Sequence, residues 1–197
     1  PLSSIACECR CGGATLMVDD AHGMGVEGAE GRGTVSGFGL SPLEVPVLMG
    51  TLGKAFGVSG AFVAGSEALI ETLIQQARTY IYTTATPPAQ AEATRKALQL
   101  VREGEDRRQH LQQLIARFRS GATALGLNLM HSVTPIQPLL VGDSAAALQR
   151  SRQLQKSGIL VAPMRPPTVP EGGARLRITL SANHTFEQVD RLLEALQ

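Results

Sequence analysis

The chain has 197 residues, of which 43% are hydrophobic, and its 18 basic and 17 acidic residues leave a net charge of +1. This is the composition of an ordinary globular protein, long enough for one sizeable core or two small ones. Mixed charges give no basic face for nucleic acid, and no apolar run has the length of a membrane span or follows a basic leader. We therefore expect a cytoplasmic protein without nucleic-acid or membrane partners.

Residues 5–11 predict the end of a helix that holds all three cysteines, Cys7, Cys9 and Cys11. A tetrahedral metal site needs a fourth ligand, and no further Cys or His is near in the sequence. Reduced thiols on an amphipathic helix are therefore expected, rather than a metal site. The chain starts without Met directly before this helix, as a protein cut in its interior would start.

Three short apolar runs predict strands, at residues 14–18, 45–49 and 61–64. Continuous apolar runs are typical of strands buried on both faces of a parallel sheet. The third run leads into a helical pattern over 66–77. Strands and helices in alternation predict an α/β layer.

A long helical pattern opens at Pro87 and Pro88 and continues past Gly104. Prolines suit the first turn of a helix because their missing amide donors are not needed there. Beyond this connector, the patterns predict strands at 136–141, 159–162 and 175–180 and helices at 144–157 and after 185. The expected domains are the large layer at 1–87, the connecting helix at 88–105 and a small α+β domain at 106–197.

The glycines of residues 23–28 match the G-x-G-x-x-G pattern of dinucleotide-binding proteins. That pattern works only when a helix begins inside it, because the helix N-terminus holds the pyrophosphate. Residues 29–34 continue with glycines and show no helical pattern. A flexible loop is therefore favoured over a nucleotide-binding oxidoreductase.

Two segments that follow predicted strands carry reactive side chains. Asp19, Asp20 and His22 come directly after the first strand, and Lys54 stands among glycines and apolar residues after the second. A lone Asp-x-x-His is more often a capped turn or a satisfied core pair. A buried lysine, however, is a neutral amine that can form a Schiff base. Together, a strand-end Asp and a desolvated Lys are the two protein groups that pyridoxal 5'-phosphate (PLP) requires.

Three segments resemble the core motifs of the α-oxoamine synthase family, a group of fold-type I PLP enzymes. They are residues 18–23 (VDDAHG), 31–33 (GRG) and 50–57 (GTLGKAFG). The resemblance continues to the C-terminus through residues 81–88, 165–170 and 174–180. It implies an α/β chain that is the C-terminal half of a fold-type I PLP-dependent transferase. Such a half would consist of a remnant of the large, mainly parallel-sheet domain and a small α+β C-terminal domain.

The resemblance also implies roles toward the cofactor. Lys54 would bind the aldehyde of PLP as a Schiff base, and Asp19 would pair with the pyridine nitrogen. His22 would bond the phenolic oxygen. Thr51 would contact the phosphate.

Further roles follow for residues outside these motifs. Thr83 or Thr84 would reach the phosphate held by the neighbouring subunit of a homodimer. Thr168 would line the substrate site, and Arg165 would lie near the acyl substrate. Arg177 would grip the carboxylate of the amino acid. Because Arg177 alternates with apolar neighbours, a solvated strand face is the alternative for it.

Within the family, the resemblance is greatest to the member that condenses L-alanine with a pimeloyl thioester in biotin biosynthesis. The acyl carrier would be coenzyme A or a carrier protein, so the expected partners are alanine and pimeloyl-CoA or a pimeloyl-carrier protein. A glycine-using member of the family and a non-catalytic dimerisation module are the alternatives. The segments of the family's N-terminal half are missing, so we expect these residues alone to bind PLP weakly or not at all.

Overall fold

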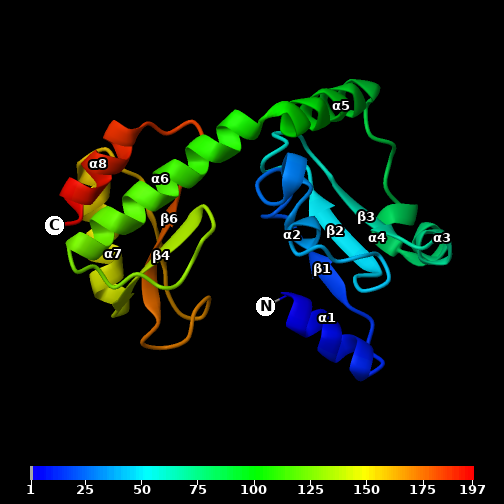
Figure 1. The fold of residues 1–197 in the computed structure, drawn as a ribbon, viewed down its shortest axis with the longest axis horizontal. Helices are drawn as coiled ribbons and strands as arrows, with labels where there is room; N and C mark the ends of the chain where they lie inside the picture. The colour runs from blue at the N-terminus through cyan, green and yellow to red at the C-terminus, as the bar shows by residue number, and fades with distance from the viewer. Residues whose placement is uncertain (1) are drawn as a thin grey trace. The chain divides into compact units, whose positions relative to one another are not determined.

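The computed structural model describes residues 2–197, which form two compact units, one ending at Glu105 and one from Asp106 to Gln197 (Figure 1). The elements up to Glu103 are α1 (Leu2–Cys11), β1 (Met17–Asp19), the 3-10 helix η1 (Ala29–Gly31), α2 (Thr34–Gly37), β2 (Val47–Thr51), β3 (Ala61–Gly65), α3 (Glu67–Gln76), α4 (Arg78–Ile81) and α5 (Pro88–Glu103). Those that follow are α6 (Glu105–Ala124), β4 (Ile136–Gly142), α7 (Ser144–Lys156), β5 (Ala162–Met164), β6 (Ala174–Thr179) and α8 (Phe186–Ala195).

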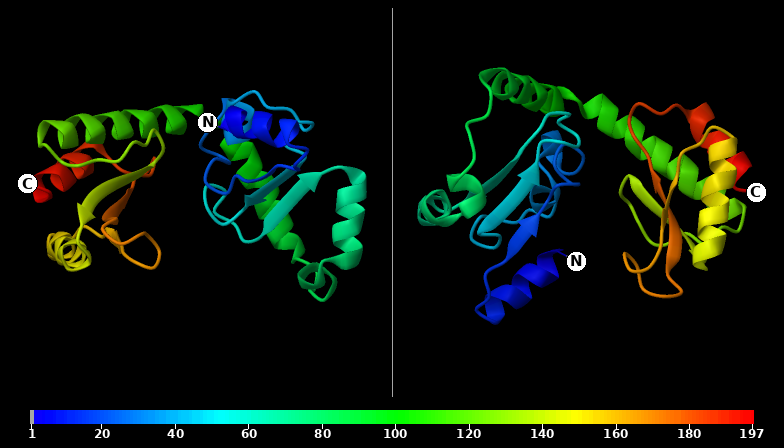
Figure 2. Two further views of the ribbon diagram at one scale, coloured as in Figure 1. Left: turned by 90° about the horizontal axis from the view of Figure 1, so that it is seen from below. Right: turned by 180° about the vertical axis from the view of Figure 1, so that it is seen from behind.

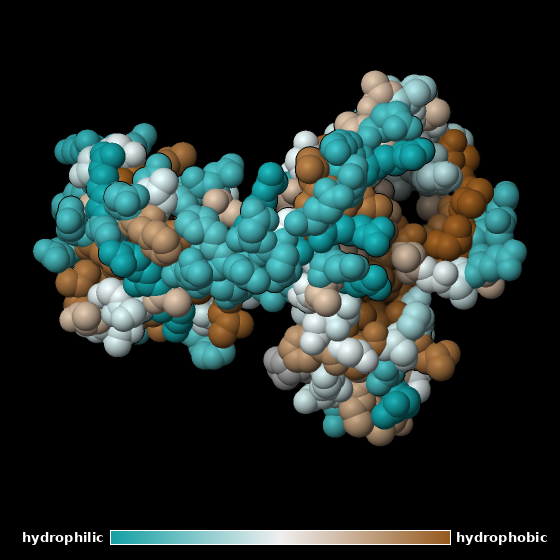
Figure 3. All heavy atoms as spheres, turned by 45° about the horizontal axis from the view of Figure 1, so that its top comes forward, coloured by the Kyte–Doolittle hydropathy of each residue, from teal (hydrophilic) through white to brown (hydrophobic). Residues whose placement is uncertain are grey.

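The sheet of the first unit has the strand order β1-β2-β3, with β1 parallel and β3 antiparallel to β2. The expectation that these strands are buried on both faces is wrong for the described residues. Met17 in β1 is 58% exposed and Val63 in β3 is 38% exposed. A strand is buried on both faces only where packed layers cover both sides of its sheet. Outside the strands, large hydrophobic side chains also lie at the surface of this unit (Figure 3), among them Phe38, Leu43 and Tyr82.

Helix starts follow the capping residues in the sequence. The Ser66 hydroxyl accepts a hydrogen bond from the amide of Leu69 at the start of α3. Asp143 does the same at the start of α7, where its carboxylate accepts from the amide of Ala146 at 2.7 Å. Thr185 forms a capping box with Gln188 at the start of α8. Such caps satisfy amide donors that the first helical turn leaves without partners.

The long helical pattern is two helices, because α5 ends at Gly104 and α6 begins with the next residue. Gly104 is buried and has a non-helical ψ of 40°, which breaks the ladder of backbone hydrogen bonds. Within the first unit, α5 passes beside the edge of the sheet at which β1 and β2 end (Figures 1 and 2). No helix of residues 2–197 is both long and apolar enough to span a bilayer.

The second unit has an antiparallel sheet of order β4-β6-β5, with α6, α7 and α8 on one side of it (Figures 1 and 2). Its core brings together fully buried side chains from α6, β4, β6 and α7, including Leu114, Phe118, Leu139, Leu176 and Leu154. Side chains of β6 alternate between the two faces of the sheet, and Ala174, Leu176 and Ile178 are the buried ones. The arginines of β6 therefore share the opposite face.

Candidate functional site

The carboxyl ends of β1 and β2 bring four predicted site residues to one edge of the sheet. Because the two strands are parallel and Asp19 pairs in register with Met49, the segments that follow them leave the sheet on the same side. One segment contains Asp19 and His22, and the other contains Thr51 and Lys54. Ligands of open α/β sheets bind at this edge.

The two segments are in close contact with each other. A Cβ atom added to Gly25 would lie 2.6 Å from the Cβ of Ala55 and 3.6 Å from Val101 of α5. Only a residue without a side chain allows so close an approach. The segment of His22 therefore packs directly beside the residue that follows Lys54.

The adjacent aspartates point in opposite directions. Asp19 is exposed at the strand end, and its Oδ1 accepts a hydrogen bond from the amide of Ala21 at 3.0 Å. Asp20 is only 4% exposed, and its Oδ2 accepts from the amide of Thr34 at 2.7 Å. Side chains alternate between faces along a strand, so one carboxylate faces the open edge while the other faces inward. Asp19 is the aspartate that a ligand at this edge can reach.

Thr51 offers a polar atom that lacks a partner. Its Oγ1 is buried and makes no hydrogen bond to any residue of the described chain. A buried hydroxyl without a partner costs about 1–3 kcal/mol. A ligand oxygen at this edge would remove that cost, so the site fits the phosphate group of PLP.

The expected burial of Lys54 is wrong, because the residue is exposed in a bend. The apolar neighbours that suggested burial, Leu52 and Phe56, are themselves half-buried, while the lysine side chain lies at the surface. The turn is closed by the amide of Gly57, which donates to the carbonyl of Lys54 at 3.0 Å. The apolar residues on either side of Lys54 thus predicted their own partial burial, and not the burial of the lysine.

The segment after β1 is partly helical, so the expectation that residues 29–34 contain no helix is also wrong. It contains η1, and α2 begins at Thr34. Gly31 and Gly33 are buried within it, and the amide of Gly33 donates to the carbonyl of Glu27 at 2.8 Å. These glycines allow the backbone of the segment to pack closely against itself.

The remaining predicted residues are not part of this edge group. Thr83 and Thr84 are exposed between α4 and α5. Arg165 and Thr168 are exposed in the segment between β5 and β6, where the amide of Thr168 donates to the carbonyl of Arg165 at 3.0 Å. Arg177 is half-buried on β6, and its guanidinium has no hydrogen bond or ion pair with another described residue. Their roles in substrate and phosphate binding stay predictions.

Glu27 is a charged residue of this region that the sequence did not single out. Its pKa is raised above the ordinary value, first by burial and second by the negative charge of Asp20. Its Oε1 is buried without a hydrogen-bond partner among residues 2–197. No pattern in the sequence signals this, because the burial arises from the fold of residues 23–33.

The raised pKa of Glu27 predicts a pH-dependent effect of replacing it. A carboxyl with a higher pKa in the folded state contributes stability below its unfolded pKa, and this is lost as the pH rises through the folded pKa. We therefore expect Glu27→Gln to raise the free energy of unfolding at pH 7 and to change it little below about pH 4. Thermal unfolding of both proteins at the two pH values measures this. The same shift at both pH values would contradict the explanation.

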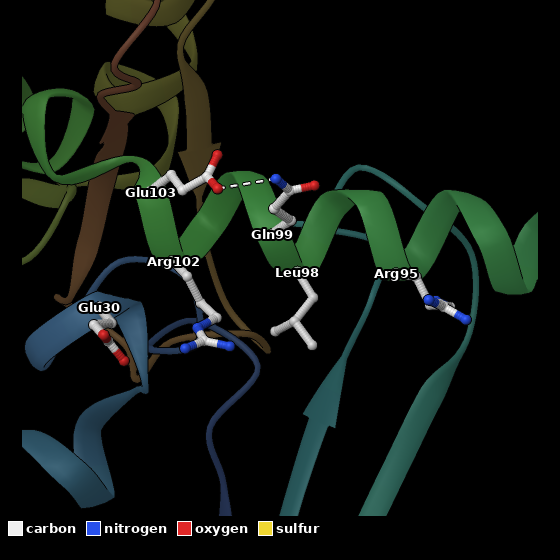
Figure 4. A pocket seen from close by; sticks show the side chains of 6 residues that line it. All are labelled: Glu30, Arg95, Leu98, Gln99, Arg102 and Glu103. Carbon is white, nitrogen blue, oxygen red and sulfur yellow. Dashed lines mark hydrogen bonds between the residues drawn. The ribbon is translucent and has the colours of Figure 1, made fainter.

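A separate hollow of about 440 Å³ lies between η1 and α5 and contains none of the predicted site residues. Arg95, Leu98 and Arg102 leave α5 on the side of the hollow (Figure 4). The side-chain amide of Gln99 donates to the carboxylate of Glu103 at 2.9 Å, and the carboxylate of Glu30 forms an ion pair with Arg32 at 2.8 Å. Both carboxylates that line the hollow, Glu30 and Glu103, are thus already engaged within the chain.

Comparisons with known proteins identify the family of the chain. The sequence pattern of the family "Aminotransferase class I and II" matches residues 3–196. The chain is 63% identical over 196 residues to the 8-amino-7-oxononanoate synthase of Thioalkalivibrio sulfidiphilus, covering 100% of this chain and 50% of that protein. The chain spans about half the length of the curated relatives it matches.

Solved structures give the same result. Serine palmitoyltransferase of Sphingomonas wittichii matches with a TM-score of 0.91 and 30% identity, over 99% of this chain and 49% of that one. The 8-amino-7-oxononanoate synthase of Francisella tularensis matches with a TM-score of 0.86 and 36% identity, over 97% of this chain and 57% of that one. The predicted α/β fold of PLP-dependent transferases is confirmed. The chain belongs to the aminotransferase class I and II family, whose cofactor is PLP.

Proposed function

We propose that this chain carries the cofactor-binding lysine of a PLP-dependent acyltransferase. The whole enzyme would condense L-alanine with a pimeloyl thioester to 8-amino-7-oxononanoate in biotin biosynthesis. The observation that carries the proposal is the grouping of Asp19, His22, Thr51 and Lys54 at one edge of the sheet. The high identity to enzymes with that name supports the choice of substrates.

Each of these residues has a distinct task in the proposal. Bound PLP supplies an electron sink for negative charge on the carbon next to the amino group of the substrate. Asp19 holds a proton on the ring nitrogen, and His22 donates to the phenolic oxygen. The hydroxyl of Thr51 donates to the phosphate, which gives the buried oxygen its missing partner. The exposed amine of Lys54 would hold the cofactor through its aldehyde and, when free, would accept the α-proton of alanine.

In the overall reaction, one carbon–carbon bond forms, and the carbon–sulfur bond of the thioester and the bond from the α-carbon to the carboxylate break. A proton returns to the α-carbon after the carboxylate is lost, and the leaving thiolate takes up a proton. The α-carbon of alanine attacks the thioester carbonyl, the thiol leaves, and the carboxylate of alanine is lost as carbon dioxide. In our proposal, Arg177 holds that carboxylate in a bidentate contact, Thr168 lines the substrate site and Arg165 lies near the acyl group. The half-buried, unpaired guanidinium of Arg177 supports this assignment.

The proposal extends to a homodimer in the cytoplasm. In it, Thr83 or Thr84 contacts the phosphate held by the neighbouring subunit, and the acyl carrier is coenzyme A or a carrier protein. This extension rests on the resemblance to α-oxoamine synthases.

The test is product analysis with the protein at the full length of its relatives. Incubation with PLP, pimeloyl-CoA and either alanine or glycine should give 8-amino-7-oxononanoate and carbon dioxide with alanine and little product with glycine. A preference for glycine would assign a glycine-using member of the family instead. Absence of product with both amino acids and with either acyl carrier would favour a non-catalytic role.

A further inference from the structure

Asp20 occupies the centre of the segment that follows β1. Its Oδ2 accepts from the amide of Thr34, the first residue of α2, whose N-cap position is Gly33. Glycine has no side chain to cap a helix, so a carboxylate 14 residues earlier in the chain satisfies this amide donor. The two ends of the segment are thereby joined.

The surrounding backbone is shaped to admit this carboxylate. A Cβ atom on Gly23 would collide with the Asp20 carboxylate and the Thr34 hydroxyl, and one on Gly33 would collide with Asp20 as well. The main chain of Asp20 adds three bonds, since its amide donates to Met49 at 2.8 Å and its carbonyl accepts from Gly23 and Met24. Asp20 thus binds β2, the turn after β1 and the start of α2 at once.

The residues on both sides of Asp20 are those assigned to the cofactor. Asp19 precedes it on the strand, and His22 follows two residues later in the turn that the Asp20 carbonyl closes. We propose that Asp20 is the positioning residue of the cofactor site, whose buried carboxylate fixes the segment that presents Asp19 and His22. This inference rests on the proposed function, because it gives these two residues their task toward PLP.

A positioning role predicts two results in the protein at the full length of its relatives. Asp20→Ala should speed hydrogen exchange of the Thr34 amide and of the amides of residues 23–33 in the cofactor-free protein. It should also raise the Kd for PLP about 10-fold. Removing a residue that orients the ligands of a metal ion typically weakens binding by about 10- to 100-fold, and we expect the lower end of that range here. Asp20→Asn keeps the shape of the side chain and a neutral oxygen acceptor, so it should change the exchange rates and the Kd less. If the alanine variant does not fold, the asparagine variant is used for the test.

Asp143→Ala is the matched control. Its carboxylate also accepts from a helix-start amide at 2.7 Å, but in the second unit. It should speed exchange at the start of α7 and leave the Kd for PLP unchanged.

The outcomes separate this inference from the proposed function. Unchanged exchange at Thr34 in both Asp20 variants, or a Kd changed no more than in Asp143→Ala, would overturn the positioning role. A wild-type protein that binds no PLP would overturn the proposed function and the cofactor part of this inference. In that case the exchange rates still decide whether Asp20 fixes the segment.

Discussion

Lys54→Ala, made in the protein at the full length of its relatives, is expected to lower kcat by about 10³-fold or more. In the proposed function, Lys54 would be both the covalent partner of PLP and the base. Lys54 is one of three lysines in the chain and the one at the carboxyl ends of β1 and β2. The other two lysines of the chain are Lys96 on α5 and Lys156 on α7. Steady-state kinetics with alanine and pimeloyl-CoA measure the loss.

Lys96→Ala is the control for this substitution. Lys96 lies on α5, and its ammonium group donates to Gln99 at 3.0 Å on the exposed surface. Removing it should leave kcat within a factor of about 2, as expected for a surface position away from the chemistry. Equal losses in the two variants, or a Lys54→Ala protein with wild-type kcat, would refute the role of Lys54.

Gly33→Ala is expected to destabilise the protein by about 3–5 kcal/mol, because strain and overpacking combine at this position. Gly33 has a φ of +93°, a conformation that costs energy for residues with a side chain. A Cβ there would also collide with the carboxylate of Asp20 and lie 3.1 Å from Sδ of Met24. Since native domains are stable by only about 5–15 kcal/mol, this loss would remove most of the stability of a domain at the lower end of that range.

Gly39→Ala separates the two contributions. Gly39 has a φ of +66°, but nothing lies within 4 Å of the place a Cβ would take. Only strain applies there, so we expect a loss of about 1–2 kcal/mol. Thermal or urea unfolding of both variants gives the comparison, and equal losses would show that the packing around Asp20 contributes nothing.

Helices with strong local signals were predictable from the sequence. The pattern over 144–157 became α7 (Ser144–Lys156), and that over 66–77 became α3 (Glu67–Gln76). In both cases a Ser or Asp cap fixes where the helix starts, and a cap depends on residues only a few positions apart. The order of strands and helices, and with it the fold class, followed from such local patterns.

Strand limits were less predictable because they depend on the partner strand. The apolar run at 159–162 predicted a strand, yet β5 covers Ala162–Met164. The amide of Ile159 instead donates to Leu154, closing the end of α7, and Leu160 is 87% exposed. Likewise, the run at 14–18 pairs with β2 only from Met17 onward. Hydrophobicity alone does not show where pairing begins.

The sequence predicted that Asp19, His22, Thr51 and Lys54 follow neighbouring strands, but it did not predict the environment of these side chains. Two adjacent aspartates at a strand end must point to opposite faces, and composition does not say which one is buried. The resemblance assigned Asp19, and the exposure of Asp19 beside a buried Asp20 is compatible with that choice. The exposure of Lys54 and the buried carboxyl of Glu27 depend on how the turn at residues 54–57 and the segment 23–33 fold, which hydrophobicity along the sequence does not show.

The most direct test of the central claim is to locate the lysine that binds PLP. The protein at the full length of its relatives is incubated with PLP, reduced with borohydride, digested and analysed by mass spectrometry. The account predicts a pyridoxyl group on Lys54, and none on that peptide in Lys54→Ala. Modification confined to Lys96 or Lys156, or no modification of the wild-type protein, would contradict the assignment of a PLP site to this edge of the sheet.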